Sequence, residues 1–233
     1  MDNNLDFVSY LYLSKDKLSI CIFKVPNLKI VYEKKIIINS LYNDIDFEQI
    51  KDFLDENIIK SEKILKYFIK KIFIILDTED FFPILISVKK DNGGNLLTLE
   101  NLSYSLNDAK LQCKKTMEKK KIIHMLIENY QIDSKDYSFF PKELKCNYFS
   151  LDVKFICLSE IFIKNLEKCL SRYQISIDQI ISANYIKDHF KDNHDLYRKA
   201  WQITKGCNPN EIKFYNKSLN NKGFFEKFFN FFK

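Results

Sequence analysis

Apolar positions in the first part of the chain follow the pattern of β-strands. Residues 7–13, 17–25 and 28–39 are rich in β-branched and aromatic side chains, and short polar segments separate them. Apolar runs bounded in this way by turn residues are typical of strands. They predict a strand meander at the start of the fold.

The pattern then changes to the three- and four-residue steps of an amphipathic helix. In residues 44–71 the apolar side chains at this spacing are Phe47, Ile50, Leu54, Ile58, Leu65 and Phe68. Lysines and acids fill the positions between them, so one or two helices are expected, with the apolar side facing a core. Residues 71–78 and 82–90 are short apolar runs and predict two more strands.

A second set of elements follows a turn at residues 91–94. Thr98 is a candidate N-cap for a helix over residues 98–118, whose expected inner stripe is Leu99, Leu102, Leu106 and Leu111. Residues 121–133 and 147–158 predict strands. A helix over residues 159–175 is expected to be capped by Ser159, with an inner side of Ile163, Leu166 and Leu170. This order predicts an α/β fold with a mixed sheet.

The net charge of +6 invites a search for polyanionic partners. Of the 37 basic residues, however, only Arg172 and Arg198 are arginine. The bidentate guanidinium that reads guanine and clamps phosphate is therefore almost absent, which argues against specific nucleic-acid binding. Nonspecific binding through lysine remains an alternative.

Motifs for chemistry are missing from the sequence. The four glycines form neither a dinucleotide-binding fingerprint nor a P-loop, and the six cysteines are too widely spaced for a zinc site or a disulfide framework. His124 lies in an apolar strand and is interpreted as structural rather than as a base. The acidic cluster of Asp77, Glu79 and Asp80 is interpreted as a solvated strand end. We expect no enzyme activity, no metal and no cofactor.

The last eleven residues, 223–233, contain six phenylalanines. At about 100° per residue the six rings share one side of a helix, while Glu226, Lys227, Asn230 and Lys233 share the other. Such a short helix is marginal alone, so it folds against the protein's own core, a partner or a membrane. The membrane alternative predicts a lipid-binding set of Lys222, Phe224, Phe225, Lys227, Phe228, Phe229, Phe231, Phe232 and Lys233.

This tail, and the order of elements before it, resemble the bacterial cell-division family FtsA of the actin-like superfamily. Residues 11–25 resemble the opening strand, turn and strand of that family, and residues 46–76 its first helix and next strand. Residues 97–112 and 120–134 resemble its inserted subdomain IC, and residues 152–185 the return into subdomain IA.

The resemblance implies half of an actin-like, ribonuclease-H-like fold with a strand-helix-strand-strand insertion and a C-terminal amphipathic helix. Residues 5–83 and 150–190 would form an IA-like subdomain, and residues 84–149 an IC-like one. Residues 191–220 would be a linker, and residues 221–233 a membrane-targeting helix. No signal peptide or membrane-spanning run is expected, so the protein would bind the cytoplasmic face of the inner membrane from the cytoplasm.

The family holds nucleotide phosphate and metal with an Asp and a Gly in its first turn, where this sequence has Tyr12 and Ser14. The resemblance therefore implies a non-catalytic adaptor in cell division. Its partners would be anionic lipid and division proteins, such as FtsA-type subunits and, indirectly, FtsZ, and it could self-associate. The alternatives are a PilM-like scaffold of type IV pilus assembly and a residual actin-like ATPase.

Overall fold

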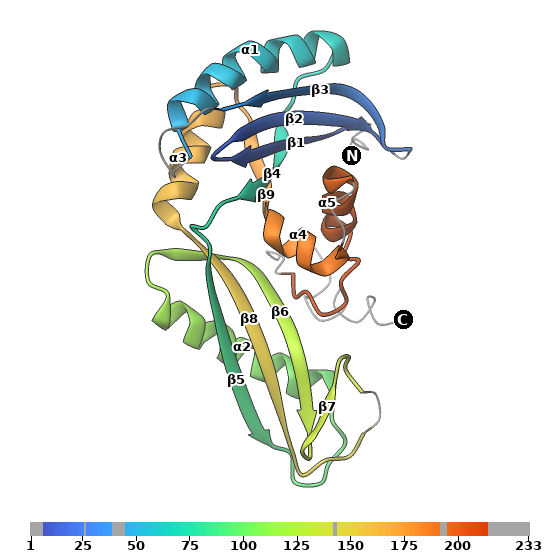
Figure 1. The fold of residues 1–233 in the computed structure, drawn as a ribbon. Helices are drawn as coiled ribbons and strands as arrows, with labels where there is room; N and C mark the ends of the chain where they lie inside the picture. The colour runs from blue at the N-terminus through green and yellow to red at the C-terminus, as the bar shows by residue number, and fades with distance from the viewer. Residues whose placement is uncertain (1–6, 26, 39–44, 142–143, 192–194, 214–233) are drawn as a thin grey trace, which may run out of the picture. The chain divides into compact units, whose positions relative to one another are not determined.

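Figure 1 shows the computed structural model of the chain, which describes residues 7–25, 27–38, 45–141, 144–191 and 195–213. The chain divides into two compact units. Unit 1 comprises residues 1–81, 119–123 and 158–205, and unit 2 comprises residues 82–118, 124–157 and 206–233. Strands and helices occur in both units, which confirms the predicted mixed α/β class. The assignment of subdomain names to these units stays a prediction.

Unit 1 is built on a five-stranded mixed sheet. Its strands are β1 (Phe7–Ser14), β2 (Lys17–Lys24), β3 (Lys29–Ile37), β4 (Lys71–Asp77) and β9 (Ser176–Ser182). They lie in the order β3-β2-β1-β4-β9. Strands β1 to β3 form an antiparallel meander, as predicted, while β1, β4 and β9 are parallel neighbours. The parallel pairs need crossover connections, and helices supply them.

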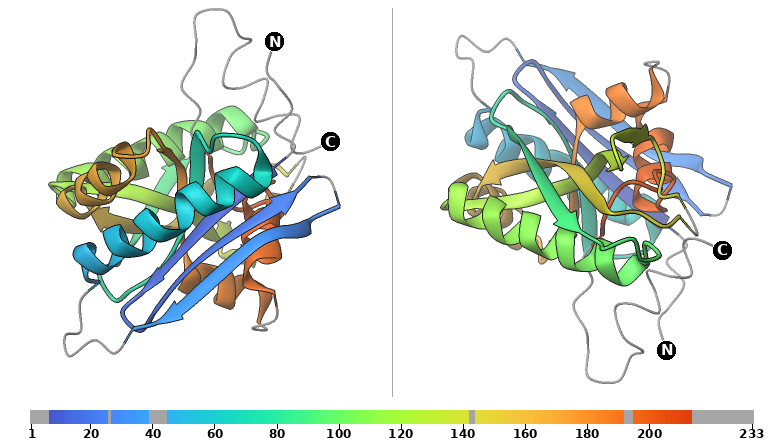
Figure 2. Two further views of the ribbon diagram at one scale, coloured as in Figure 1. Left: turned by 90° about the horizontal axis from the view of Figure 1, so that it is seen from above. Right: turned by 90° about the horizontal axis from the view of Figure 1, so that it is seen from below.

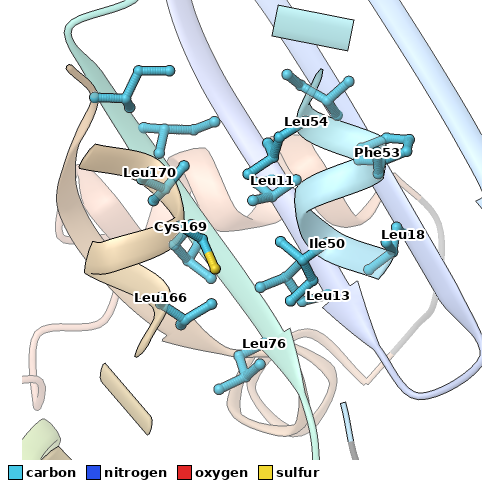
Figure 3. Packing of buried hydrophobic residues seen from close by; sticks show 14 of the residues in the cluster. Leu11, Leu13, Leu18, Ile50, Phe53, Leu54, Leu76, Leu166, Cys169 and Leu170 are labelled. Carbon is cyan, nitrogen blue, oxygen red and sulfur yellow. The ribbon is translucent and has the colours of Figure 1, made fainter. Parts of the chain in front are cut away.

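Two helices, α1 (Phe47–Leu65) and α3 (Glu160–Ser171), cover one face of this sheet (Figure 1, Figure 2). Side chains from both helices meet those of β1, β2 and β4 in a buried cluster. Figure 3 labels part of it: Leu11, Leu13, Leu18, Ile50, Phe53, Leu54, Leu76, Leu166, Cys169 and Leu170. Alternate residues of the strands, such as Leu11 and Leu13 of β1, point to this face.

Capping sets the limits of α1. The Asp46 side chain accepts the backbone N–H of Glu48 at 2.9 Å, and the left-handed Lys66 ends the helix. The predicted inner stripe is correct as far as Leu65. Phe68 is a correction, because it lies beyond the helix end and its side chain is 74% exposed.

The opposite face of the unit 1 sheet is aromatic and was not foreseen. Helices α4 (Ala183–Phe190) and α5 (Leu196–Thr204) follow β9. The Tyr197 ring of α5 lies about 6 Å from the rings of Tyr10 and Phe23, and Tyr10 stacks on Phe73 at 5.2 Å between centroids. The segment after residue 190, for which the sequence predicted no element, therefore completes the second side of this unit.

Unit 2 carries the predicted strand-helix-strand-strand order. Its elements are β5 (Phe82–Asp91), α2 (Leu99–Thr116), β6 (Lys120–Ile132), the short β7 (Lys135–Tyr137) and β8 (Tyr148–Ser159). The sheet order is β5-β8-β6-β7, so the last long strand is inserted between the first two. Strand β6 begins in unit 1 and continues into unit 2, and β8 begins in unit 2 and ends in unit 1. The additional β7 pairs with the end of β6 in a hairpin.

The helix caps give one confirmation and one correction. Thr98 forms a capping box with Asn101 at the start of α2, as the N-cap prediction required. Ser159 is the N-cap residue of α3, but its side chain makes no capping hydrogen bond. Leu111 is a second correction, because its side chain is 57% exposed rather than part of the inner stripe of α2.

Candidate functional site

The predicted lipid-binding residues, from Lys222 to Lys233, lie outside the described part of the chain. The structure does show how the segment before them is held. The Ile212 N–H donates to the Met125 carbonyl at 2.8 Å, and the Ile127 N–H donates to the Asn210 carbonyl at 2.9 Å. Residues 210–212 thus lie antiparallel along β6, and the tail begins at this fixed place in unit 2.

A buried side-chain contact reinforces this attachment. His124 Nδ1 of β6 lies 2.8 Å from Glu211 Oε1, and the two side chains are 0% and 3% exposed. The interpretation of His124 as a structural residue is confirmed, since it holds the last described segment rather than facing solvent. We call residues 210–212, with their bonds to β6, the tail clip.

A polar hollow of about 510 Å³ lies in unit 1, at the turn between β1 and β2. The end of β4, the loop after it and the start of α4 also line it. Its lining residues are Ser14, Lys15, Asp16, Ile45, Asp77, Thr78, Glu79, Asp80 and Asn184. Because β1 and β4 are parallel with Ser14 beside Asp77, their carboxyl ends meet here. This edge is where open α/β sheets bind ligands.

Three hydrogen-bonded side chains, of Tyr12, Asp77 and Lys187, connect the ends of β1 and β4 with α4 beside the hollow. The Tyr12 hydroxyl and the Lys187 ammonium of α4 both donate to Asp77 Oδ2 at 2.8 Å. Burial, and then the hydrogen bond to Asp77, raise the pKa of Tyr12, so its hydroxyl stays a donor at neutral pH. Lys17 Nζ lies 4.6 Å from the centre of the Tyr12 ring. Asp77 Oδ2 is therefore engaged by two protein donors, while the Asp77 side chain still lines the hollow.

Two of the other three acids of the hollow accept side-chain hydrogen bonds. Ser14 Oγ donates to Asp16 Oδ1 at 2.6 Å, and this bond is the main reason why the pKa of Asp16 is lowered. Thr78 Oγ1 donates to Asp80 Oδ2 at 2.8 Å. These bonds help to fix the turn after β1 and the loop after β4.

The hollow does not fit a nucleotide phosphate. Its lining has four carboxylates, from Asp16, Asp77, Glu79 and Asp80, against the single ammonium of Lys15. The β1–β2 turn contains no glycine through which backbone N–H groups could approach a phosphate. Within the described ranges, no group of three or more acidic, histidine or cysteine side chains is arranged to hold a bridging metal ion.

Sequence reasoning found Tyr12, Ser14 and Asp77 but not their connection, and it missed Lys187 altogether. The parallel pairing of β1 with β4 could have been inferred from the strand-helix-strand order, and it would have brought Tyr12 and Asp77 together. Lys187 lies in α4, and the available signal for the start of that helix was Ser182, an N-cap residue whose hydroxyl accepts the Tyr185 N–H at 3.3 Å.

Comparison with known proteins gives no family. No protein-family model and no curated protein matches the sequence. Among solved structures, the cytoplasmic domain of EpsL, an inner membrane component of the type II secretion system of Vibrio cholerae, is similar with a TM-score of 0.38 and 12% identity. The match covers 77% of this chain and 57% of that chain.

Two further solved structures are similar at the same level. A Bacteroides thetaiotaomicron protein of unknown function with an actin-like ATPase fold has a TM-score of 0.37 and 16% identity, covering 80% of this chain and 55% of that chain. The PilM-PilN type IV pilus biogenesis complex has a TM-score of 0.45 and 7% identity, covering 78% and 49%. This chain thus spans about half the length of the structures it matches. None of the three is described as an FtsA.

Proposed function

We propose that this chain is a non-catalytic, FtsA-like adaptor that binds the cytoplasmic face of the bacterial inner membrane through residues 221–233. The observation that carries the proposal is the separation of side chains in the last eleven residues. On a helix the six phenylalanines share one side, opposite Glu226, Lys227, Asn230 and Lys233. Segments of this kind lie in the plane of the lipid interface, where lysines attract anionic head groups.

The energetics support reversible attachment. Full burial of one phenylalanine contributes about 1.5–3 kcal/mol, so partial burial of six rings is enough to offset the cost of ordering a short helix. No helix in the described ranges has the length and apolarity needed to cross a bilayer. The tail clip adds a defined starting point for the attachment, because Ile212 is hydrogen-bonded to β6 one residue before the last described position.

A flotation assay tests the anchor. We expect the full chain to float with vesicles of phosphatidylcholine and phosphatidylglycerol, and the variant with Phe225→Glu and Phe228→Glu to stay at the bottom. A matched control with Asn221→Glu and Asn230→Glu adds the same charge without touching the rings, and it should keep most of the binding. Equal flotation of the phenylalanine variant and this control would contradict the proposal.

The absence of catalysis is part of the proposal, and the acid-rich lining of the hollow supports it. Isothermal titration of the protein with ATP and Mg²⁺ should give no binding heat. Measurable saturable binding would favour the residual ATPase instead.

The division role rests on the resemblance and on the tail, and a PilM-like scaffold of pilus assembly would share the same membrane position. Affinity capture from cells followed by mass spectrometry separates the two. Division proteins, including FtsA-type subunits, should be enriched with the wild-type chain. Enrichment of pilus assembly proteins in their place would refute the division role.

A further inference from the structure

The C-terminal half of α1 and the turn after it expose an unusual set of apolar side chains. Ile64, Tyr67 and Phe68 are 55%, 41% and 74% exposed. Single exposed apolar residues are normal on a protein surface, but three within five residues form a patch. Ile59 is also exposed, but at about 100° per residue it lies about 140° from Ile64 around α1 and is not part of this patch. The buried residues of α1 lie at other positions, so the core does not cover these three side chains.

Lysines surround these side chains. Lys60, Lys63, Lys66 and Lys70 are all exposed, and none of them forms a salt bridge with another described residue. Glu62, the one acid among them, is turned to the protein, where its carboxylate accepts the Ile69 N–H at 2.9 Å. We call Ile64, Tyr67 and Phe68, with these four lysines, the α1 patch.

The other half of the same helix is different. The exposed charged side chains of its first turns include the acids Asp52, Asp55 and Glu56. Asp55 also accepts a hydrogen bond from the Tyr173 hydroxyl. The combination of positive charge with exposed apolar surface is therefore confined to the C-terminal end of α1 and does not extend along the whole helix.

We infer that the α1 patch is a second contact with an anionic lipid surface, separate from the tail. Aromatic and aliphatic side chains enter the interface of a bilayer, and lysine stems extend along them with the ammonium groups at the head groups. Each lysine near an anionic surface adds attraction. A protein partner fits less well, because protein interfaces are depleted in lysine and favour arginine. This second contact rests on the proposed membrane attachment. Unlike the tail, however, the patch belongs to the folded unit 1.

Vesicle partitioning tests the α1 patch in the full chain. Ile64→Glu with Phe68→Glu changes two exposed side chains, and Phe139→Glu with Ile161→Glu is a matched control with the same charge change at side chains that are 63% and 66% exposed. Both pairs are made with the native tail and with the Phe225→Glu, Phe228→Glu tail. The measured quantity is the partition coefficient on phosphatidylcholine vesicles with and without phosphatidylglycerol.

We expect the patch variant to bind phosphatidylglycerol vesicles about tenfold more weakly than the matched control, with either tail. A second variant, Lys63→Gln with Lys70→Gln, should lose binding only on the anionic vesicles and should show a weaker salt dependence. Unchanged circular dichroism and melting temperature would verify that these surface changes leave the fold intact.

The results for the two membrane contacts can be separated. If the patch variant partitions like the matched control, the α1 patch is not a lipid contact, whatever the tail does. If the tail variant binds like the wild type while the patch variant does not, the α1 patch is a lipid contact and the proposed tail anchor is refuted. A patch variant that loses self-association in sedimentation but keeps its vesicle binding would overturn the inference in favour of a contact between copies.

Discussion

Replacing His124 by leucine should loosen the tail clip. The imidazole lies 2.8 Å from the Glu211 carboxylate, and both side chains are almost completely buried. Leucine has a similar volume but no hydrogen-bonding atom, so the Glu211 carboxylate keeps its burial and loses this partner. The perturbation therefore acts on the attachment of residues 210–212 while leaving the packing volume of β6 nearly unchanged.

Two routes compete in the variant. Keeping the carboxylate buried without this hydrogen bond costs about 1–3 kcal/mol. Releasing residues 210–212 avoids that cost, but it loses two backbone hydrogen bonds and the burial of Ile212, together about 3–6 kcal/mol. The closed clip therefore remains the main state of the variant. Its stability should fall by about 1–3 kcal/mol, with a clear increase in its opening.

Hydrogen exchange measured by mass spectrometry reports this directly, because the amides of Ile127 and Ile212 are donors in the clip. Both should exchange much faster in His124→Leu than in the wild type. The double variant with Glu211→Leu is the control, since replacing both partners by apolar residues is often nearly neutral. Wild-type protection in the single variant, or equal losses in the single and double variants, would refute this account of the pair.

Four further predictions concern the core, a helix cap, a buried tyrosine and the cysteines. Leu166→Ala, in the fully buried inner side of α3, should lower the free energy of unfolding by about 2–5 kcal/mol in urea titration. Thr98→Ala removes the cap of α2 and should cost about 1 kcal/mol in the same assay. The raised pKa of Tyr12 favours the protonated folded state, so stability present below pH 10 should fall as the pH rises further, and Tyr12→Phe should reduce that slope in alkaline titration. With a thiol reagent, Cys207 should react in the native protein, slowed because burial raises the pKa of its thiol, and the five buried cysteines only after unfolding.

The elements with strong local signals were predictable from the sequence. The meander of residues 7–37 is rich in β-branched and aromatic side chains separated by short turns. Thr98 caps α2 because its spacing to Asn101 permits the reciprocal bonds of a capping box. Leu111 and Phe68 were wrong for different reasons. Leu111 lies on the outer side of α2, whose inner stripe continues through Ala109 and Cys113 instead. Phe68 lies beyond the left-handed residue that ends α1.

The second face of the unit 1 sheet could not be predicted, because its signal is not local. Tyr10 and Phe23 looked like ordinary strand residues, and Tyr197 lies in a polar stretch of mixed composition. Only the folded chain shows that α5 brings the Tyr197 ring over this aromatic face and its hydroxyl to Ser19. The connection of Tyr12, Asp77 and Lys187 has the same cause, since it joins residues that are far apart in sequence.

The tail clip also has a mechanical meaning. Any force on the tail is transmitted to unit 2 through residue 213. A pull directed away from the sheet reaches the bond from the Ile212 N–H to the Met125 carbonyl before the bond from the Ile127 N–H to the Asn210 carbonyl. Such loading opens bonds in sequence, as in unzipping, rather than all at once, as in shear. The protein would then yield at its attachment under low tension, and its two folded units would stay intact.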